Sequence, residues 1–184
     1  MRAVAVALVL FGLGCHGSPS TTRTDLRAYL ARTKAWAPVE AESARTIQRI
    51  LRTQFVDEAE VRRQIADNRP RVLAHLEALR GYTPVSQDIA RVHARYIAAW
   101  EKLLAGYDAI EEGFSSGDYT KLARGREAME AWRDEIVAVA ADLRSLMQHF
   151  GIDADGTVES RGGAVDSQCS MQSTKSSASP AAIA

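Results

Sequence analysis

Three side chains that could bind a metal or transfer protons fall on or beside the apolar stripes of predicted helices: Glu40, His75 and His93. His93 takes a stripe position between aromatic and aliphatic residues, where an imidazole without a hydrogen-bond partner would destabilise the fold. Counted from the turn at Gly81, Glu40 and His93 differ by roughly 6 Å along the helix axes. A Glu40–His93 hydrogen bond is therefore expected, with His75 near the same level.

These residues allow two interpretations. As a metal site, His93, His75 and Glu40 would bind zinc or iron between the helices. As a polar layer, they would satisfy one another's hydrogen bonds and fix the register of the helices. None of the pairs has the Glu-x-x-His spacing of di-iron bundles. We favour the polar layer and expect no cofactor.

The sequence contains no other set of residues that points to catalysis. It has no Ser/His/Asp set, no glycine-rich phosphate loop and no P-loop. Adjacent carboxylates, such as Glu111 and Glu112, point to different sides of a helix and do not converge on a substrate. Four aromatic residues at heptad spacing are typical of a helical core: Tyr96, Trp100, Tyr107 and Trp132. We therefore expect a protein that is not an enzyme.

Two long apolar stripes at heptad spacing dominate the second half of the chain. The short segment Ser115–Ser116–Gly117 separates them, so the two helices must fold back as an antiparallel pair. Gly125 holds a stripe position and is expected to admit a bulky neighbour such as Trp100. The stripe residues are Ile89, His93, Tyr96, Trp100, Leu103, Tyr107, Ile110 and Phe114, followed by Leu122, Gly125, Met129, Trp132, Ile136, Val139, Leu143, Leu146 and Phe150.

Two further helices precede this pair. The first is predicted to start at a cap formed by Thr24 and Asp25 and to continue through Pro38, because its stripe keeps its phase across the proline. That stripe consists of Leu26, Leu30, Thr33, Ala37, Glu40, Ala44, Ile47 and Leu51. The second helix carries Val61, Ile65, Val72, Leu76 and Leu79. A second kink is expected at its Pro70.

The helix boundaries have specific sequence signals. Asp57 and Glu60 predict a capping box, with Val56 and Val61 as the apolar staple around it. Gly81 predicts a left-handed end to the second helix. The remaining signals are Thr83–Pro84 and Asp118 for the starts of the last two helices, and Gly151 for the end of the fourth.

Together these patterns predict an all-α fold. Residues 24–150 should form a single up-down-up-down four-helix bundle, because short connections allow no other order. Residues 151–184 are rich in small polar side chains and are expected to be a disordered tail.

Composition restricts the partners and the redox chemistry. Lysine plus arginine equals aspartate plus glutamate at 23 each. No basic stripe interleaved with aromatic residues is present, which argues against a nucleic-acid partner. The only cysteines are Cys15 and Cys169, so the fold cannot depend on a disulfide framework.

The first residues indicate export. Arg2 precedes eleven apolar or glycine positions, Ala3 to Leu13. This run is too short to span a bilayer core of about 30 Å and suits the apolar region of a signal peptide. With Gly14 before Cys15 and polar residues after it, the segment resembles the leader of bacterial lipoproteins, although Gly12 stands where that class usually has leucine. The resemblance covers the leader alone.

This resemblance implies a signal peptide at residues 1–14 and a lipidated Cys15, with a tether at residues 15–23. It places the protein in the bacterial cell envelope, anchored by lipid, and His16 after the cysteine favours the outer membrane, with the protein facing the periplasm or the exterior. Two functions follow as expectations. The first is a non-catalytic envelope lipoprotein whose bundle has a structural role or docks an envelope protein. The alternative is a bundle that binds a metal or a small ligand through the His93, Glu40 and His75 layer.

Overall fold

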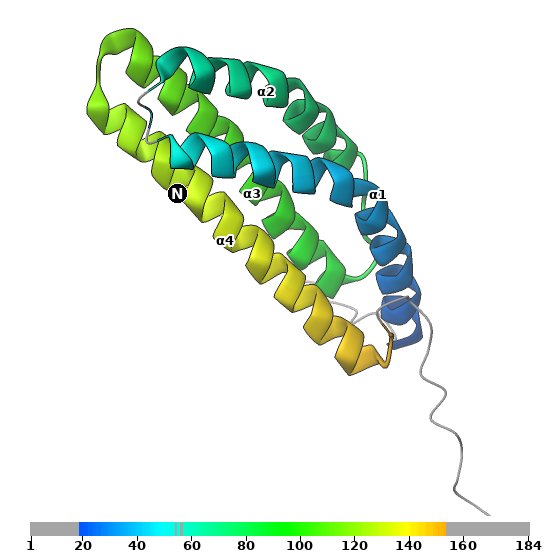
Figure 1. The fold of residues 1–184 in the computed structure, drawn as a ribbon. Helices are drawn as coiled ribbons and strands as arrows, with labels where there is room; N and C mark the ends of the chain where they lie inside the picture. Colours follow the sequence, from blue (N-terminus) through cyan, green and yellow to red (C-terminus); the bar gives the residue numbers. More distant parts are fainter. Residues whose placement is uncertain (1–18, 54, 56, 154–184) are drawn as a thin grey trace, which may run out of the picture.

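The computed structural model describes residues 19–53, 55 and 57–153, and these form an antiparallel four-helix bundle (Figure 1). The helices are α1 (Pro19–Arg52), α2 (Glu58–Arg80), α3 (Gln87–Ser116) and α4 (Tyr119–Phe150). The short connections between them produce the predicted up-down-up-down order, and the all-α fold class is confirmed. The leader, Cys15, Val56 and residues 154–184 lie outside the described residues.

Helix α1 begins earlier than the sequence indicated. It starts at Pro19, so residues 19–23 of the predicted tether are helical and Thr24–Asp25 is not a cap. Asp25 is buried and accepts hydrogen bonds from the backbone N–H groups of Val85 (3.0 Å) and Ser86 (2.7 Å). An aspartate is an effective acceptor for such groups, but here it serves the segment before α3 rather than its own helix.

The other boundaries agree with the sequence in part. Asp57 and Asp118 cap α2 and α4 by accepting from Glu60 N–H and Thr120 N–H, at 3.0 and 2.8 Å. The cap of α3 is Ser86 and not Thr83. Gly81 is right-handed, with φ −73°, so the predicted left-handed end is wrong there. Gly151 does end α4 with φ +60°, as expected.

Both internal prolines are accommodated within continuous helices. Pro38 lies inside α1 and Pro70 inside α2. In Figure 1, α1 changes direction between its dark-blue first part and its cyan last part. A proline removes one helical hydrogen bond and crowds the preceding turn, which favours such a bend.

The closest helix packing in the bundle is between α3 and α4. A Cβ atom on Gly125 would lie 2.4 Å from Ile110 Cγ1 and 2.8 Å from the backbone oxygen of Gly106. Gly125 therefore permits close approach of the α3 backbone. The prediction that it makes room for Trp100 is wrong. Trp100 packs edge-on against Trp132 instead, with ring centroids 5.2 Å apart.

The apolar surface of α1 is only partly covered. Its buried residues include Leu26, Tyr29, Trp36 and Ile50, and α4 packs far less closely against α1 than against α3. Leu26 and Ile47 of the predicted stripe are buried, as expected. At four other levels the buried residue is the one before the predicted residue, because Tyr29, Trp36, Ser43 and Ile50 are buried in place of Leu30, Ala37, Ala44 and Leu51. These last four residues line the seam between α1 and α4, which determines where a ligand could bind.

Within the described part of the chain, no helix combines the length and the apolar character that crossing a bilayer requires.

Candidate functional site

His93 is buried, as predicted, at 4% exposure. Its Nε2 lies 2.9 Å from the carbonyl oxygen of Leu79, and its Nδ1 lies 3.1 Å from the hydroxyl of Tyr29. Because a carbonyl oxygen can only accept, Nε2 carries a proton. Burial lowers the pKa of His93, so the imidazole is neutral at neutral pH and the Tyr29 hydroxyl donates to its unprotonated Nδ1. Both nitrogens thus have a partner.

Glu40 belongs to a second chain of hydrogen bonds. The Tyr96 hydroxyl donates to Glu40 Oε2 at 2.8 Å. His75 Nε2 lies 3.4 Å from the same hydroxyl oxygen. The hydrogen-bonded chain therefore runs from His75 through Tyr96 to Glu40. This chain links α2, α3 and α1.

The predicted Glu40–His93 hydrogen bond is therefore wrong. Tyr96, one helical turn beyond His93 on α3, is the residue that reaches Glu40. Counting residues along the helix axes placed Glu40 and His93 near the correct end of the bundle. The relative level of these two residues was in error by about one helical turn. The metal site considered as the alternative finds no support in this arrangement: among the described residues, no group of three or more His, Cys, Asp or Glu side chains is arranged to hold a metal ion.

Aromatic rings enclose these polar groups. Trp36 stacks on His93, with centroids 6.1 Å apart and planes at 23°. Trp100 packs edge-on against His75 at 4.3 Å. Such contacts exclude water and favour a neutral imidazole. The layer consequently fixes the positions of α1, α2 and α3 relative to one another.

Burial sets the protonation states within the layer. It lowers the pKa of His75 to about 4 and also lowers the pKa of His93. Burial, reinforced by the Glu40 carboxylate, raises the pKa of the Tyr96 hydroxyl, and burial raises that of Tyr29. At neutral pH the imidazoles are thus uncharged and the hydroxyls protonated.

A groove between α1 and α4 adjoins this layer and forms a cavity of about 590 Å³, a size common for small-molecule sites. Its floor consists of the buried side chains Tyr29, Tyr96, Val139, Leu143 and Ile152. Its exposed rim is formed by Lys34, Ala37, Ala140, Arg144 and Gln148. Glu40 lines one part of the groove, so the His75–Tyr96–Glu40 chain ends at its surface.

The same seam continues into a second hollow of about 510 Å³. On α1 it is lined by residues from Ala44 to Arg52, and on α4 by residues from Arg126 to Arg133. Trp132 forms part of its inner wall. The two hollows together therefore follow α1 from Tyr29 to Arg52.

Two buried hydrogen-bonding residues, Tyr29 and Asn68, were missed from the sequence. Tyr29 was assigned no role because Leu30 was placed on the buried stripe. Asn68 was also missed; it donates to the Tyr107 hydroxyl at 2.7 Å and lies 3.3 Å from Ser43 Oγ. The sequence did contain a pattern that indicates burial of Tyr29, because Asp25, Tyr29 and Trp36 lie on one face of α1.

The fold and site together define an all-α antiparallel bundle with a buried aromatic and histidine layer and an open groove between its first and last helices. Comparisons with protein-family models, with curated proteins and with solved structures found no match.

Proposed function

We propose that this chain is a non-catalytic, lipid-anchored protein of the bacterial envelope whose bundle binds a small apolar molecule in the groove between α1 and α4. The observation that carries the binding proposal is the groove itself. Apolar side chains of α1, among them Leu30 and Ala37, face a cavity of about 590 Å³ that α4 does not fill. Uncovered apolar surface of this kind is typical of ligand sites.

The polar layer is a weaker candidate for the binding site. Both nitrogens of His93 have partners within the protein, and aromatic rings surround the layer. A ligand could reach it only by displacing these contacts. The layer supports the groove instead, because it fixes Tyr29 and Tyr96, whose rings form part of the floor.

The position of the groove fits an anchored protein. Pro19, where α1 begins, follows Cys15 by four positions, a chain length of at most about 14 Å. Tyr29, the first groove residue of α1, lies about 15 Å further along the helix. The start of α1 and the end of α4 lie at the same end of the bundle (Figure 1). A lipid at Cys15 would therefore hold the groove within about 30 Å of the membrane surface.

Anchoring can be tested by Cys15→Ser in a bacterial host. We expect the wild-type chain to be cut before Cys15, to carry lipid and to sediment with membranes, because several acyl chains anchor stably. The variant should remain as an uncut precursor without lipid. Mass spectrometry of the N-terminus and membrane fractionation measure both. A wild-type chain that is soluble, with a mature N-terminus elsewhere, would contradict the anchoring proposal.

Ligand binding can be tested with Nile red, a neutral dye whose emission increases in apolar surroundings. Residues 16–184 include all four helices that the structure describes, and we expect the dye to bind the groove of this chain. Ala140→Trp should reduce binding at least fivefold, because Ala140 is on the groove rim. Ala141→Trp is the matched control, since Ala141 is exposed and does not line the groove. Equal binding by the two variants would contradict the groove as the site.

A further inference from the structure

We infer that the groove between α1 and α4 binds an apolar alcohol, whose hydroxyl group donates a hydrogen bond to the carboxylate of Glu40. The inference rests on the proposed function and goes further by specifying the head group of the ligand and the residue that binds it. It depends on three features: the unused oxygen of Glu40, the place of Glu40 at one end of the lined part of α1, and the apolar floor beyond it.

Glu40 offers one unused acceptor to the groove. Among the described residues that line the groove, it is the only carboxylate. Its Oε2 accepts from the Tyr96 hydroxyl at 2.8 Å, which orients the carboxylate. Its Oε1 has neither a hydrogen bond nor an ion pair with any residue that the structure describes. Because a carboxylate oxygen can only accept, and because hydrogen bonds to a charged group are the stronger ones, Glu40 favours a ligand that brings a donor.

The number of unused acceptors favours a neutral head group. A hydroxyl group brings one hydrogen, which matches the one unused oxygen of Glu40. An ammonium group brings a charge and three donors, and the apolar walls would leave the remaining donors without partners at a considerable cost. A carboxylate head group would be repelled by Glu40. A hydroxyl group is therefore the head group that best fits Glu40.

The place of Glu40 leaves the length of the groove for the apolar part of the ligand. The residues of α1 that line the groove run from Tyr29 to Glu40, so Glu40 stands at one end of this stretch. The stretch is about 16 Å long at the helical rise per residue, which accommodates a medium-length alkyl chain. From Glu40 the chain would run toward the end of the bundle where α1 starts and α4 ends (Figure 1).

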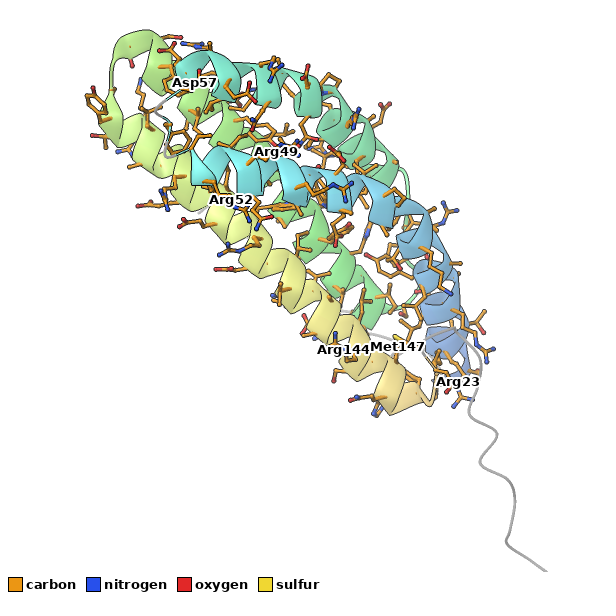
Figure 2. All side chains as sticks on the ribbon, in the orientation of Figure 1. Arg23, Arg49, Arg52, Asp57, Arg144 and Met147 are labelled. Atoms are coloured by element: carbon orange, nitrogen blue, oxygen red, sulfur yellow. The ribbon has the colours of Figure 1, made fainter. Side chains whose placement is uncertain are left out.

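The floor beyond Glu40 suits such a chain. Val139, Leu143 and Ile152 are buried, apolar residues of this floor. Arg144 and Met147, which Figure 2 labels, continue the lining along α4 toward the end of that helix. Every methylene group of the ligand that leaves water for this surface favours binding. The alkyl chain thus provides the affinity, and the hydroxyl group fixes which way the ligand lies.

The experiment uses the full chain in membranes of a bacterial host and three photoreactive probes that share one dodecyl chain and one diazirine group. One probe ends in a hydroxyl, one in a methyl ether and one in an amine. The ether keeps the oxygen but has no hydrogen to donate. Mass spectrometry locates and quantifies the labelled peptides, and labelling of total membrane protein corrects for partition of each probe into the bilayer. We expect the alcohol to label the α4 segment 136–148 about tenfold more strongly than the ether does.

Glu40→Gln reverses the group that faces the groove. The amide oxygen can still accept from Tyr96, which leaves the amide NH₂ group, a donor, in the place of Glu40 Oε1. The alcohol and the ether can both accept from this donor, so the ratio of alcohol to ether labelling should fall to about one. Glu42→Gln is the matched control and should keep the wild-type ratio, because Glu42 is a half-buried carboxylate of the same helix that does not line the groove.

Each outcome decides between the two proposals. Equal groove labelling by the alcohol and the ether in the wild type, or a ratio that Glu40→Gln does not change, would overturn the alcohol and leave an apolar groove. If Glu40→Gln lowered amine labelling more than alcohol labelling, the neutral head group would be wrong. If the variant lost ether labelling as well, its groove would be damaged and the wild-type ratio would decide. If no probe labelled the groove, the binding proposal itself would fail along with the inference.

Discussion

Replacing Trp132 with alanine is expected to lower the free energy of unfolding by about 3 to 5 kcal/mol. Trp132 is 1% exposed and packs against Trp100 in the centre of the bundle. Removing the indole leaves a cavity that the closely packed α3 and α4 backbones cannot collapse to fill. Denaturant unfolding of residues 16–184, followed by far-UV circular dichroism, measures the change.

Trp132→Phe is the matched variant for this test. The indole N–H of Trp132 is buried without a hydrogen-bond partner among the described residues. Replacing the indole with a phenyl ring therefore removes no hydrogen bond. We therefore expect Trp132→Phe to lower the free energy of unfolding clearly less than Trp132→Ala does. A loss below about 1 kcal/mol for Trp132→Ala would contradict a packed position for this side chain.

Replacing Gly125 with valine is expected to lower the free energy of unfolding by about 3 kcal/mol, the upper end of the usual range for overpacking a core. Already the first added carbon would lie 2.4 Å from Ile110 and 2.8 Å from the backbone oxygen of Gly106. Ile110 can rotate only within a full core, and a backbone oxygen cannot move without separating α3 from α4. Thermal and denaturant unfolding of the same chain measure the effect.

Gly81→Ala is the control for this prediction. Gly81 has a right-handed backbone, and an added carbon would meet its nearest atoms at an ordinary 3.5 Å. Such a substitution stabilises by about 0.4 to 1 kcal/mol, because the unfolded chain loses freedom. If Gly125→Val were as well tolerated as Gly81→Ala, the close approach of α3 and α4 would be wrong.

The sequence by itself determined the helical architecture. Heptad stripes define which face of α3 and α4 is buried, because a helix repeats its faces every seven residues. Most of the predicted stripe of α3, from Ile89 to Ile110, is buried. The caps at Asp57 and Asp118 were also predictable, since capping depends on residues within one turn. Lipidation at Cys15 stays a prediction, because Cys15 lies outside the described residues.

Only the tertiary structure decided how α1 faces its neighbours. Its sequence carries apolar residues on adjacent faces, with Tyr29 and Trp36 on one and Leu30 and Ala37 on the next. Local pattern cannot choose between them, because both satisfy the helical period. Burial of the larger aromatic side chains places Tyr29 and Trp36 inside, and leaves Leu30 and Ala37 to line the groove.

The same limit applies to the polar partners. The sequence predicted that His93 is buried, because a stripe position depends on its own helix alone. Its partners, Tyr29 and the carbonyl of Leu79, belong to two other helices. Their levels depend on the bend of α1, on where α3 begins after Ser86, and on the depth at which α1 packs. A shift of one turn, about 5 Å, exceeds the reach of a hydrogen bond, so three-dimensional packing alone pairs Glu40 with Tyr96 and His93 with Tyr29.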